Sequence, residues 1–214
     1  SSKIIHNISL LVLLIAAVIT FNETIGISRT ILFNESIVVD YLSSFMKIIT
    51  LISAFVVLLI SSNYLKNFKI FKIEYPILIL SSVLGMMIMI SSNDLIVFYM
   101  GLELQSLALY VLATFNRDQL KSSEAGLKYF VLSALSSGLL LYGCSLIYGF
   151  TGSTNFNVIA IQFNTNEYAL TFGIVFVLVG LAFKISAVPF HRWAPDVYEG
   201  SPTSVTLFLS LIHI

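Results

Sequence analysis

The sequence predicts an all-α, polytopic transmembrane helix bundle, and three observations lead to this prediction. Of the 214 residues, 57% are hydrophobic and only 10% are charged, whereas soluble domains carry roughly 25% charged residues. Apolar runs of about 20 residues, the length that crosses a hydrocarbon layer as a helix, recur along most of the chain. The runs are continuous rather than alternating and about twice as long as a barrel strand, so a β-barrel does not fit.

About seven spans are expected, each an apolar run bounded by short polar stretches. In chain order they are predicted at residues 4–21, 41–65, 75–92, 94–115, 125–150 and 168–190, with a seventh that starts near Thr203 and is broken off. The chain lacks an initiator Met and ends inside an apolar run, so both ends are expected to be cut. The first apolar segment is therefore not interpreted as a signal peptide.

The basic residues of the connections are distributed very unevenly, which predicts the orientation of the helices through the positive-inside rule. If the first helix runs from inside to outside, the outer connections carry only Arg29. The long connection at residues 151–167 has no Lys or Arg, and its Gly, Ser, Thr and Asn content is typical of a loop. The inner connections carry the remaining seven, which are Lys3, Lys66, Lys69, Lys72, Arg117, Lys121 and Arg192.

Composition also excludes several classes of function. Cys144, the single cysteine, is interpreted as a packed or lipid-facing small residue, because one cysteine gives no disulfide, iron–sulfur ligand set or zinc pair. The formal net charge is zero and no segment is basic enough to indicate nucleic acid as a partner. No Gly-rich nucleotide loop follows a strand. We therefore expect no metal site and no bound redox cofactor on this chain.

Three cations, Lys47, Lys128 and Lys184, fall inside predicted spans, together with Glu103. A charge near the bilayer centre costs about 2.5 to 3.5 kcal/mol, so it normally faces the bundle interior, finds a partner and serves transport or proton relay. Lys47 lies one to two turns from the outer end of its helix, so we interpret it as a snorkelling lysine, whose long side chain carries the ammonium group to the membrane interface. Lys128 lies about one turn into its helix and is open to either interpretation.

Glu103 lies about ten residues into its predicted helix, which at about 1.5 Å per residue places its carboxyl near the middle of the membrane. Two interpretations remain for it. The carboxyl is either a proton-exchanging group, because burial disfavours its charged form, or a protonated structural group that bonds a neighbouring helix. The functional interpretation is the preferred one.

Lys184 precedes Pro189 by five residues in its helix. Because proline has no N–H to donate to the carbonyl of Ile185, the helix is expected to kink or unwind close to Lys184. Broken helices at membrane depth line cavities where ions and water are handled. His191, seven residues after Lys184, lies on the same side if the helix resumes, and it titrates near neutral pH. The alternatives are a snorkelling Lys184 and an interfacial His191.

Four stretches closely resemble the antiporter-like subunit N family of respiratory complex I, called subunit 2 in mitochondria. They are residues 101–112, 122–132, 138–143 and 183–203. The resemblance implies about fourteen helices with two inverted five-helix repeats, of which residues 75–214 would hold the first, proton-translocating repeat and residues 1–92 N-terminal helices of one membrane domain, 1–214. It also implies a proton relay of Glu103, Lys128, Lys184 and His191.

The resemblance further implies partners, cofactors and location. The partners would be the lipid bilayer and other membrane-arm subunits of NADH:quinone oxidoreductase, which would hold NADH, FMN, the iron–sulfur clusters and quinone. The chain would lie in a bacterial plasma membrane, or in the mitochondrial inner membrane if it is organellar. Ser204 departs from the family, which usually has proline there, and the segment 209–214 does not resemble its eighth helix.

Two other classes of function remain open. One is a subunit of a multisubunit cation/proton antiporter, which shares the glutamate and the broken-helix lysine. The stretch Ala-Pro-Asp-Val-Tyr-Glu-Gly after His191 is closer to the complex I form. The other is a structural membrane scaffold, which predicts that neutralising Glu103 and Lys184 leaves proton transport unchanged.

Overall fold

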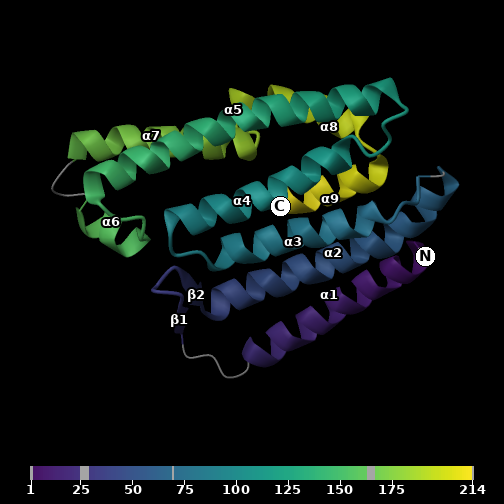
Figure 1. The fold of residues 1–214 in the computed structure, drawn as a ribbon, viewed down its shortest axis with the longest axis horizontal. Coiled ribbons are helices and arrows are strands. Elements are labelled where there is room, and N and C mark those ends of the chain that lie inside the picture. Colours follow the sequence, from purple (N-terminus) through teal and green to yellow (C-terminus); the bar gives the residue numbers. More distant parts are fainter. Residues whose placement is uncertain (1, 25–28, 69, 163–166, 214) are drawn as a thin grey trace.

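Long helices that lie side by side and run in alternating directions form most of the fold (Figure 1). The structure is a computed structural model that describes residues 2–24, 29–68, 70–162 and 167–213. A two-stranded antiparallel hairpin and a 3-10 helix join them: β1 (Thr30–Leu32), β2 (Ile37–Val39) and η1 (Phe190–Arg192). The α-helices are α1 (Ser2–Thr24), α2 (Tyr41–Asn67), α3 (Glu74–Ser91), α4 (Leu95–Ala113), α5 (Leu120–Thr151), α6 (Phe156–Gln162), α7 (Glu167–Lys184), α8 (Trp193–Gly200) and α9 (Thr203–His213).

The all-α membrane bundle predicted from the sequence is confirmed. Within the described residues, five helices, α1 to α5, are long and apolar enough to cross a membrane. The sixth predicted span is α7, whose apolar part, Leu170–Lys184, is shorter. The seventh begins at Thr203 as predicted and is α9.

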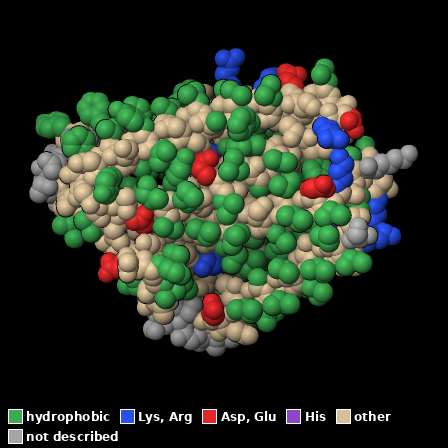
Figure 2. All heavy atoms as spheres, viewed as in Figure 1, with side chains coloured by type: hydrophobic (Ala, Val, Ile, Leu, Met, Phe, Trp, Pro, Cys, Tyr) green, Lys and Arg blue, Asp and Glu red, His purple; other side chains and the backbone are tan. Residues whose placement is uncertain are grey.

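The surface of the bundle agrees with this assignment. Figure 2 shows hydrophobic side chains over much of the visible face. Several of the visible Lys and Arg side chains lie towards the right-hand end, and others lie at the top edge and near the middle of the face. The right-hand end is the one at which α2 finishes and α5 begins in the same view (Figure 1), and it corresponds to the predicted inner side. Of the predicted inner cations, Lys69 lies outside the described residues.

Short elements at the opposite end of the bundle were not predicted. The connection at residues 151–167 contains the helix α6, and β1 and β2 form a hairpin between α1 and α2. The side chain of Asn93 donates to the carbonyl of Glu35 at 2.9 Å, and the backbone N–H of Leu95 donates to the carbonyl of Thr154 at 2.9 Å. These bonds tie the start of α4 to the hairpin and to the end of α5. They therefore fix the height of α4 in the bundle.

The predicted end of the sixth span, at residue 190, is wrong, because α7 already ends at Lys184. The N–H of Ala187 donates to the carbonyl of Ala182 at 2.8 Å, and the N–H of Ser186 donates to that of Phe183 at 3.1 Å. Together with a φ of 56° at Ser186, this is the Schellman pattern that terminates helices. The predicted break near Lys184 is thus confirmed. Its cause is the helix cap at Ser186, which comes before Pro189, rather than the proline itself.

The cap predicts the effect of a glycine at position 186. Ser186 adopts a left-handed conformation that costs a non-glycine residue roughly 1–2 kcal/mol. Since glycine adopts it without strain, Ser186→Gly should raise the thermal stability of the protein by about 1 kcal/mol or less, whereas Ser186→Val should lower it. Thermal unfolding of the purified protein in detergent measures both. Equal stability of the two variants would show that this backbone conformation does not limit stability.

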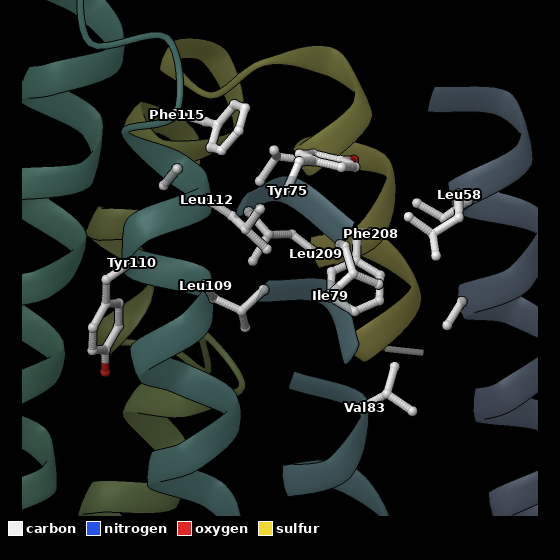
Figure 3. Close-up of a cluster of buried hydrophobic side chains, with 14 of the residues drawn as sticks. Leu58, Tyr75, Ile79, Val83, Leu109, Tyr110, Leu112, Phe115, Phe208 and Leu209 are labelled. Carbon is white, nitrogen blue, oxygen red and sulfur yellow. The ribbon is translucent and has the colours of Figure 1, made fainter. Parts of the chain in front are cut away.

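Two clusters of buried apolar residues hold the helices together. The larger lies among α2, α3, α4 and α9 and contains Leu58, Tyr75, Leu112, Phe208 and Leu209 (Figure 3). The smaller joins α4, α5, α6 and α7. Because α9 brings Phe208 and Leu209, 2% and 0% exposed, into the larger cluster, both residues pack as core, although Leu209 lies in the segment that was not expected to resemble the family's eighth helix.

Candidate functional site

Glu103 and Lys184 meet between α4 and α7. Glu103 is the ninth of the 19 residues of α4, so it lies at the middle of a membrane-length helix, as predicted. Lys184 is the last residue of α7, and its Nζ lies 3.4 Å from Oε1 of Glu103. The side chains are 11% exposed for Lys184 and 18% exposed for Glu103. The broken helix thus ends at the level of the buried carboxylate.

Three hydroxyl groups surround the ammonium group of Lys184. Its Nζ lies 3.1 Å from Oγ of Ser106, 3.1 Å from the hydroxyl of Tyr110 and 3.0 Å from Oγ of Ser133. All three distances are shorter than the 3.4 Å to Glu103. Since an ammonium group has three hydrogens to donate, the hydroxyls compete with the carboxylate for them. The charge of Lys184 is therefore held by neutral oxygens as well as by Glu103.

The carboxylate of Glu103 has a second partner on α5. The hydroxyl of Ser137 donates to Oε1, the same oxygen that faces Lys184. The adjacent Ser136 turns elsewhere and donates to the carbonyl of Gly180 on α7 at 3.2 Å. The middle of α5 therefore contacts both members of the ion pair and also the helix that carries Lys184.

A cavity of about 250 Å³ opens beside the ion pair. Its lining includes Gln105, Ser106, Tyr129 and Lys184, with apolar side chains from α3, α4 and α7 completing the wall. Gln105 is 7% exposed, and its Oε1 has no hydrogen-bond partner among the described residues. A cavity of this size with several polar groups admits water. Water in this cavity would lie against Lys184.

Lys128 lies elsewhere. Its Nζ is 2.7 Å from Glu124 and 2.7 Å from Asp196, and its side chain is 42% exposed. A second pair, Lys121 with Glu199 at 3.0 Å, joins the same two helices. These pairs tie the start of α5 to α8. Exposed ion pairs contribute about 0 to 1 kcal/mol each, so their main effect is to orient the segment that follows the break.

His191 lies in η1, beyond the break, and its side chain is exposed. Among the described residues, no hydrogen bond or ion pair joins it to Lys184 or Glu103. The structure thus brings together two of the four predicted relay residues, Glu103 and Lys184, and places Lys128 and His191 towards the surface. Lys47, interpreted as a snorkelling lysine, is partly buried in α2.

Trp193 anchors the chain after the break. Its ring stacks on Tyr129 at 4.7 Å between centroids with an interplanar angle of 9°. Its Nε1–H donates to the carbonyl of Phe183 at 3.0 Å, one residue before Lys184. Trp193 is 2% exposed, so these contacts are shielded. The indole therefore holds the end of α7 against α5, next to the segment after Lys184 where the backbone is not helical.

Sequence reasoning did not identify Ser106, Tyr110, Ser133 or Ser137 as site residues. The spacing of polar residues in the sequence could have identified the site residues of α4. Positions 103, 106 and 110 are spaced by three and four residues, which places them on one face of a helix. Positions 133 and 137 on α5 are four apart in the same way. A polar stripe at helical spacing on each of two apolar helices predicts facing polar groups.

Candidate ligands for a metal are sparse. Within the part of the chain that the structure describes, no three His, Cys, Asp or Glu side chains gather into a group that could hold a metal ion. Cys144 is buried at 0% exposure, in agreement with a packed small residue. The chemistry that this site offers is therefore acid–base exchange between a carboxylate, an ammonium group, hydroxyls and water.

The fold and the site define a polytopic α-helical membrane protein with a lysine–glutamate pair buried at the end of a broken helix. The chain belongs to the NADH:quinone oxidoreductase/Mrp antiporter transmembrane family, whose model matches residues 92–214. The matched region begins just before α4 and contains Glu103, Lys184 and the hydroxyl residues that contact them.

Individual proteins confirm the resemblance to subunit N. The chain is 71% identical over 212 residues to NADH-quinone oxidoreductase subunit N of Pelagibacter ubique, covering 99% of this chain and 45% of that protein. Respiratory complex I from Thermus thermophilus contains a chain that matches with a TM-score of 0.83 and 29% identity, covering 99% of this chain and 47% of that one. The Mrp complex from a Dietzia species matches in fold alone, with a TM-score of 0.77, 23% identity, and 97% and 41% coverage.

The chain spans about half the length of these relatives. Its membrane-length helices and the bacterial source of its relatives agree with the prediction of an integral plasma membrane protein.

Proposed function

We propose that this chain is part of subunit N in the membrane arm of a NADH:quinone oxidoreductase, and that it couples electron transfer from NADH to quinone to proton translocation. The observation that carries the proposal is the buried pair of Lys184 and Glu103, 3.4 Å apart at the end of a broken helix. A buried ion pair is costly to maintain, and ionisable groups inside membranes normally serve transport. The names of the relatives support the particular complex.

The pair can act as a charge-controlled switch. Ionised Glu103 attracts the ammonium group of Lys184 and favours its protonated form. If Glu103 moves away or takes up a proton, Lys184 loses that attraction and its Nζ–H can pass a proton to water in the adjoining cavity. Conversely, return of the carboxylate draws a proton back to Nζ. Net translocation requires that the proton drawn back to Nζ comes from the opposite side of the membrane to the one that receives the released proton, and no redox change at Lys184 is involved.

Lys128 and His191 complete the proposed relay towards the inner side. Lys128 lies in a cluster with Glu124 and Asp196 that water reaches, and His191 is exposed after the break. Both side chains reach the aqueous phase, and the proposed relay requires further water between them and Lys184, because neither residue lines the cavity beside Lys184. Their role is supported by the family resemblance.

The redox groups belong, on this proposal, to partner subunits. NADH, flavin, iron–sulfur clusters and quinone would be held there, and other membrane-arm subunits would pack against this chain. The single cysteine of the sequence supports this division of labour, since iron–sulfur clusters are held by several Cys thiolates. The contribution of the chain to the enzyme is then proton transfer rather than electron transfer.

Lys184→Ala in the full-length protein tests the proposal. In membrane vesicles that contain the assembled complex, we expect loss of both NADH-driven proton pumping and NADH:quinone turnover, because the two processes are coupled. Lys121→Ala is the matched control, since Lys121 is exposed and pairs only with an exposed glutamate; it should leave both rates unchanged. Normal pumping and turnover with Lys184→Ala would reduce Lys184 to a structural lysine.

A subunit of a cation/proton antiporter is the second candidate, and the shared fold with the Mrp complex favours it. Copurification separates the two. Subunits of a quinone oxidoreductase that copurify with the full-length protein would support the first proposal, and subunits of an antiporter without NADH:quinone activity would support the second.

A further inference from the structure

We infer that Tyr110 and Ser133 are positioning residues for Lys184, and that their hydroxyl groups keep its ammonium group from closing into a tight ion pair with Glu103. The inference deepens the proposed function and rests on it. It concerns two residues that reach Lys184 from different helices, Tyr110 from α4 and Ser133 from α5.

The three groups form a closed triangle. The hydroxyl of Tyr110 donates to Oγ of Ser133 at 2.6 Å, and Nζ of Lys184 lies 3.1 Å from the first and 3.0 Å from the second. A proton passed from Lys184 to Tyr110 and on to Ser133 would return to Lys184. This triangle therefore holds the ammonium group in place rather than conducting its proton away.

The hydroxyls are themselves fixed in position. The ring of Tyr110 packs edge-on against Tyr129, with centroids 4.8 Å apart, and against Phe130 at 5.6 Å. Figure 3 shows Tyr110 projecting from the side of α4 opposite Leu109 and Leu112, which face the core around Tyr75. Tyr110 and Ser133 are 6% and 1% exposed. The Lys184 stem, with four rotatable methylene groups, is the flexible partner and takes the position that the hydroxyls set.

The consequence appears in the distance to Glu103. Ammonium–carboxylate hydrogen bonds normally measure about 2.7–2.9 Å, whereas Lys184 lies 3.4 Å from Glu103. A tight pair would hold the proton on Lys184 more firmly. Hydroxyl groups can accept from an ammonium group and donate to a neutral amine, so Tyr110 and Ser133 can hold Lys184 in both protonation states. The arrangement keeps the pair loose enough to switch.

Tyr110→Phe and Ser133→Ala in the full-length protein, within the assembled complex, test the inference. Each removes one hydroxyl and keeps the packing volume nearly unchanged. We expect NADH-driven proton pumping in vesicles to fall by about ten- to a hundredfold, which corresponds to one hydrogen bond to a charged group. Ser133→Thr restores the hydroxyl and should recover most of the rate. Immunoblotting of the complex confirms equal assembly.

Ser136→Ala is the matched control. Ser136 is on the same helix, one turn away and 1% exposed, but its hydroxyl donates to the carbonyl of Gly180 instead of contacting Lys184. We expect pumping at the normal rate. The double variant of Tyr110 and Ser133 should pump no more slowly than the worse single variant, since the two hydroxyls act as a unit.

The outcomes separate this inference from the proposed function. Normal pumping with Tyr110→Phe and Ser133→Ala, together with loss of pumping with Lys184→Ala, overturns the inference and leaves the proposed function in place. Normal pumping with all three overturns both. Failure of Ser133→Thr to restore the rate, or equal loss with Ser136→Ala, also overturns the inference, because the effect would then follow packing rather than the hydroxyl.

Discussion

Glu103→Gln should abolish NADH-driven proton pumping while the complex still assembles. Glutamine has nearly the shape of glutamate and can still accept from Ser137, but it carries no charge to attract Lys184. A positioned proton-transfer group contributes roughly 10²- to 10⁴-fold to a rate, so we expect a loss of about a hundredfold or more. The measurement is the initial rate of acidification in inverted membrane vesicles, normalised to the amount of assembled complex.

Glu199→Gln is the control for this substitution. Glu199 is a glutamate of the same chain whose side chain is 75% exposed and pairs with Lys121. Its neutralisation should lower the free energy of unfolding by at most about 1 kcal/mol and leave the pumping rate unchanged. Glu103→Asp keeps the charge but shortens the side chain, and should retain part of the activity. Undiminished pumping with Glu103→Gln would contradict a charge-controlled switch, and the pair would then be structural.

The sequence was sufficient to predict that the side chains of Glu103 and Lys184 lie inside the helix bundle, because a charge inside an apolar run is conspicuous. No soluble fold accommodates such runs, so the helix count and the depth of Glu103 followed from length alone. The break near Lys184 was predicted from Pro189, and the structure contains it. Its actual cause, a left-handed Ser186, could not be predicted because the residue that usually takes this conformation is glycine.

The sequence did not predict the carboxylate partners of Lys128 or the hydroxyl groups that surround Lys184. Lys128 pairs with Asp196, 68 positions along the chain, and only the path of the chain after the break brings them together. Tyr110 and Ser133 were overlooked for a different reason. Serine and tyrosine are common in membrane helices and carry no charge, so nothing in composition separates a hydroxyl that contacts Lys184 from one that bonds its own helix.

Gly101→Ala should destabilise the protein and impair pumping, although glycine 101 has no chemistry of its own. A Cβ built at Gly101 would lie 2.8 Å from the backbone N of Met89 and 2.9 Å from the carbonyl oxygen of Gly85. These are backbone atoms of α3, so they cannot rotate aside. Overpacking of this kind costs about 1–3 kcal/mol, and relief requires α4 to move away from α3. Thermal unfolding and vesicle acidification measure the two effects.

Gly138→Ala and Gly149→Ala on α5 provide the comparison, because a Cβ at either position meets no atom within 4 Å. Alanine is favoured over glycine in helices by roughly 0.5–1 kcal/mol, so both variants should be neutral or slightly more stable. The comparison between Gly101 and these two glycines bears on the mechanism of pumping.

Gly101 lies two residues before Glu103, and displacing α4 shifts the carboxylate and the Tyr110 hydroxyl together relative to Lys184. If Gly101→Ala lowers stability but leaves the pumping rate per assembled complex unchanged, the site tolerates movement of α4, and the close approach of α3 and α4 serves folding alone.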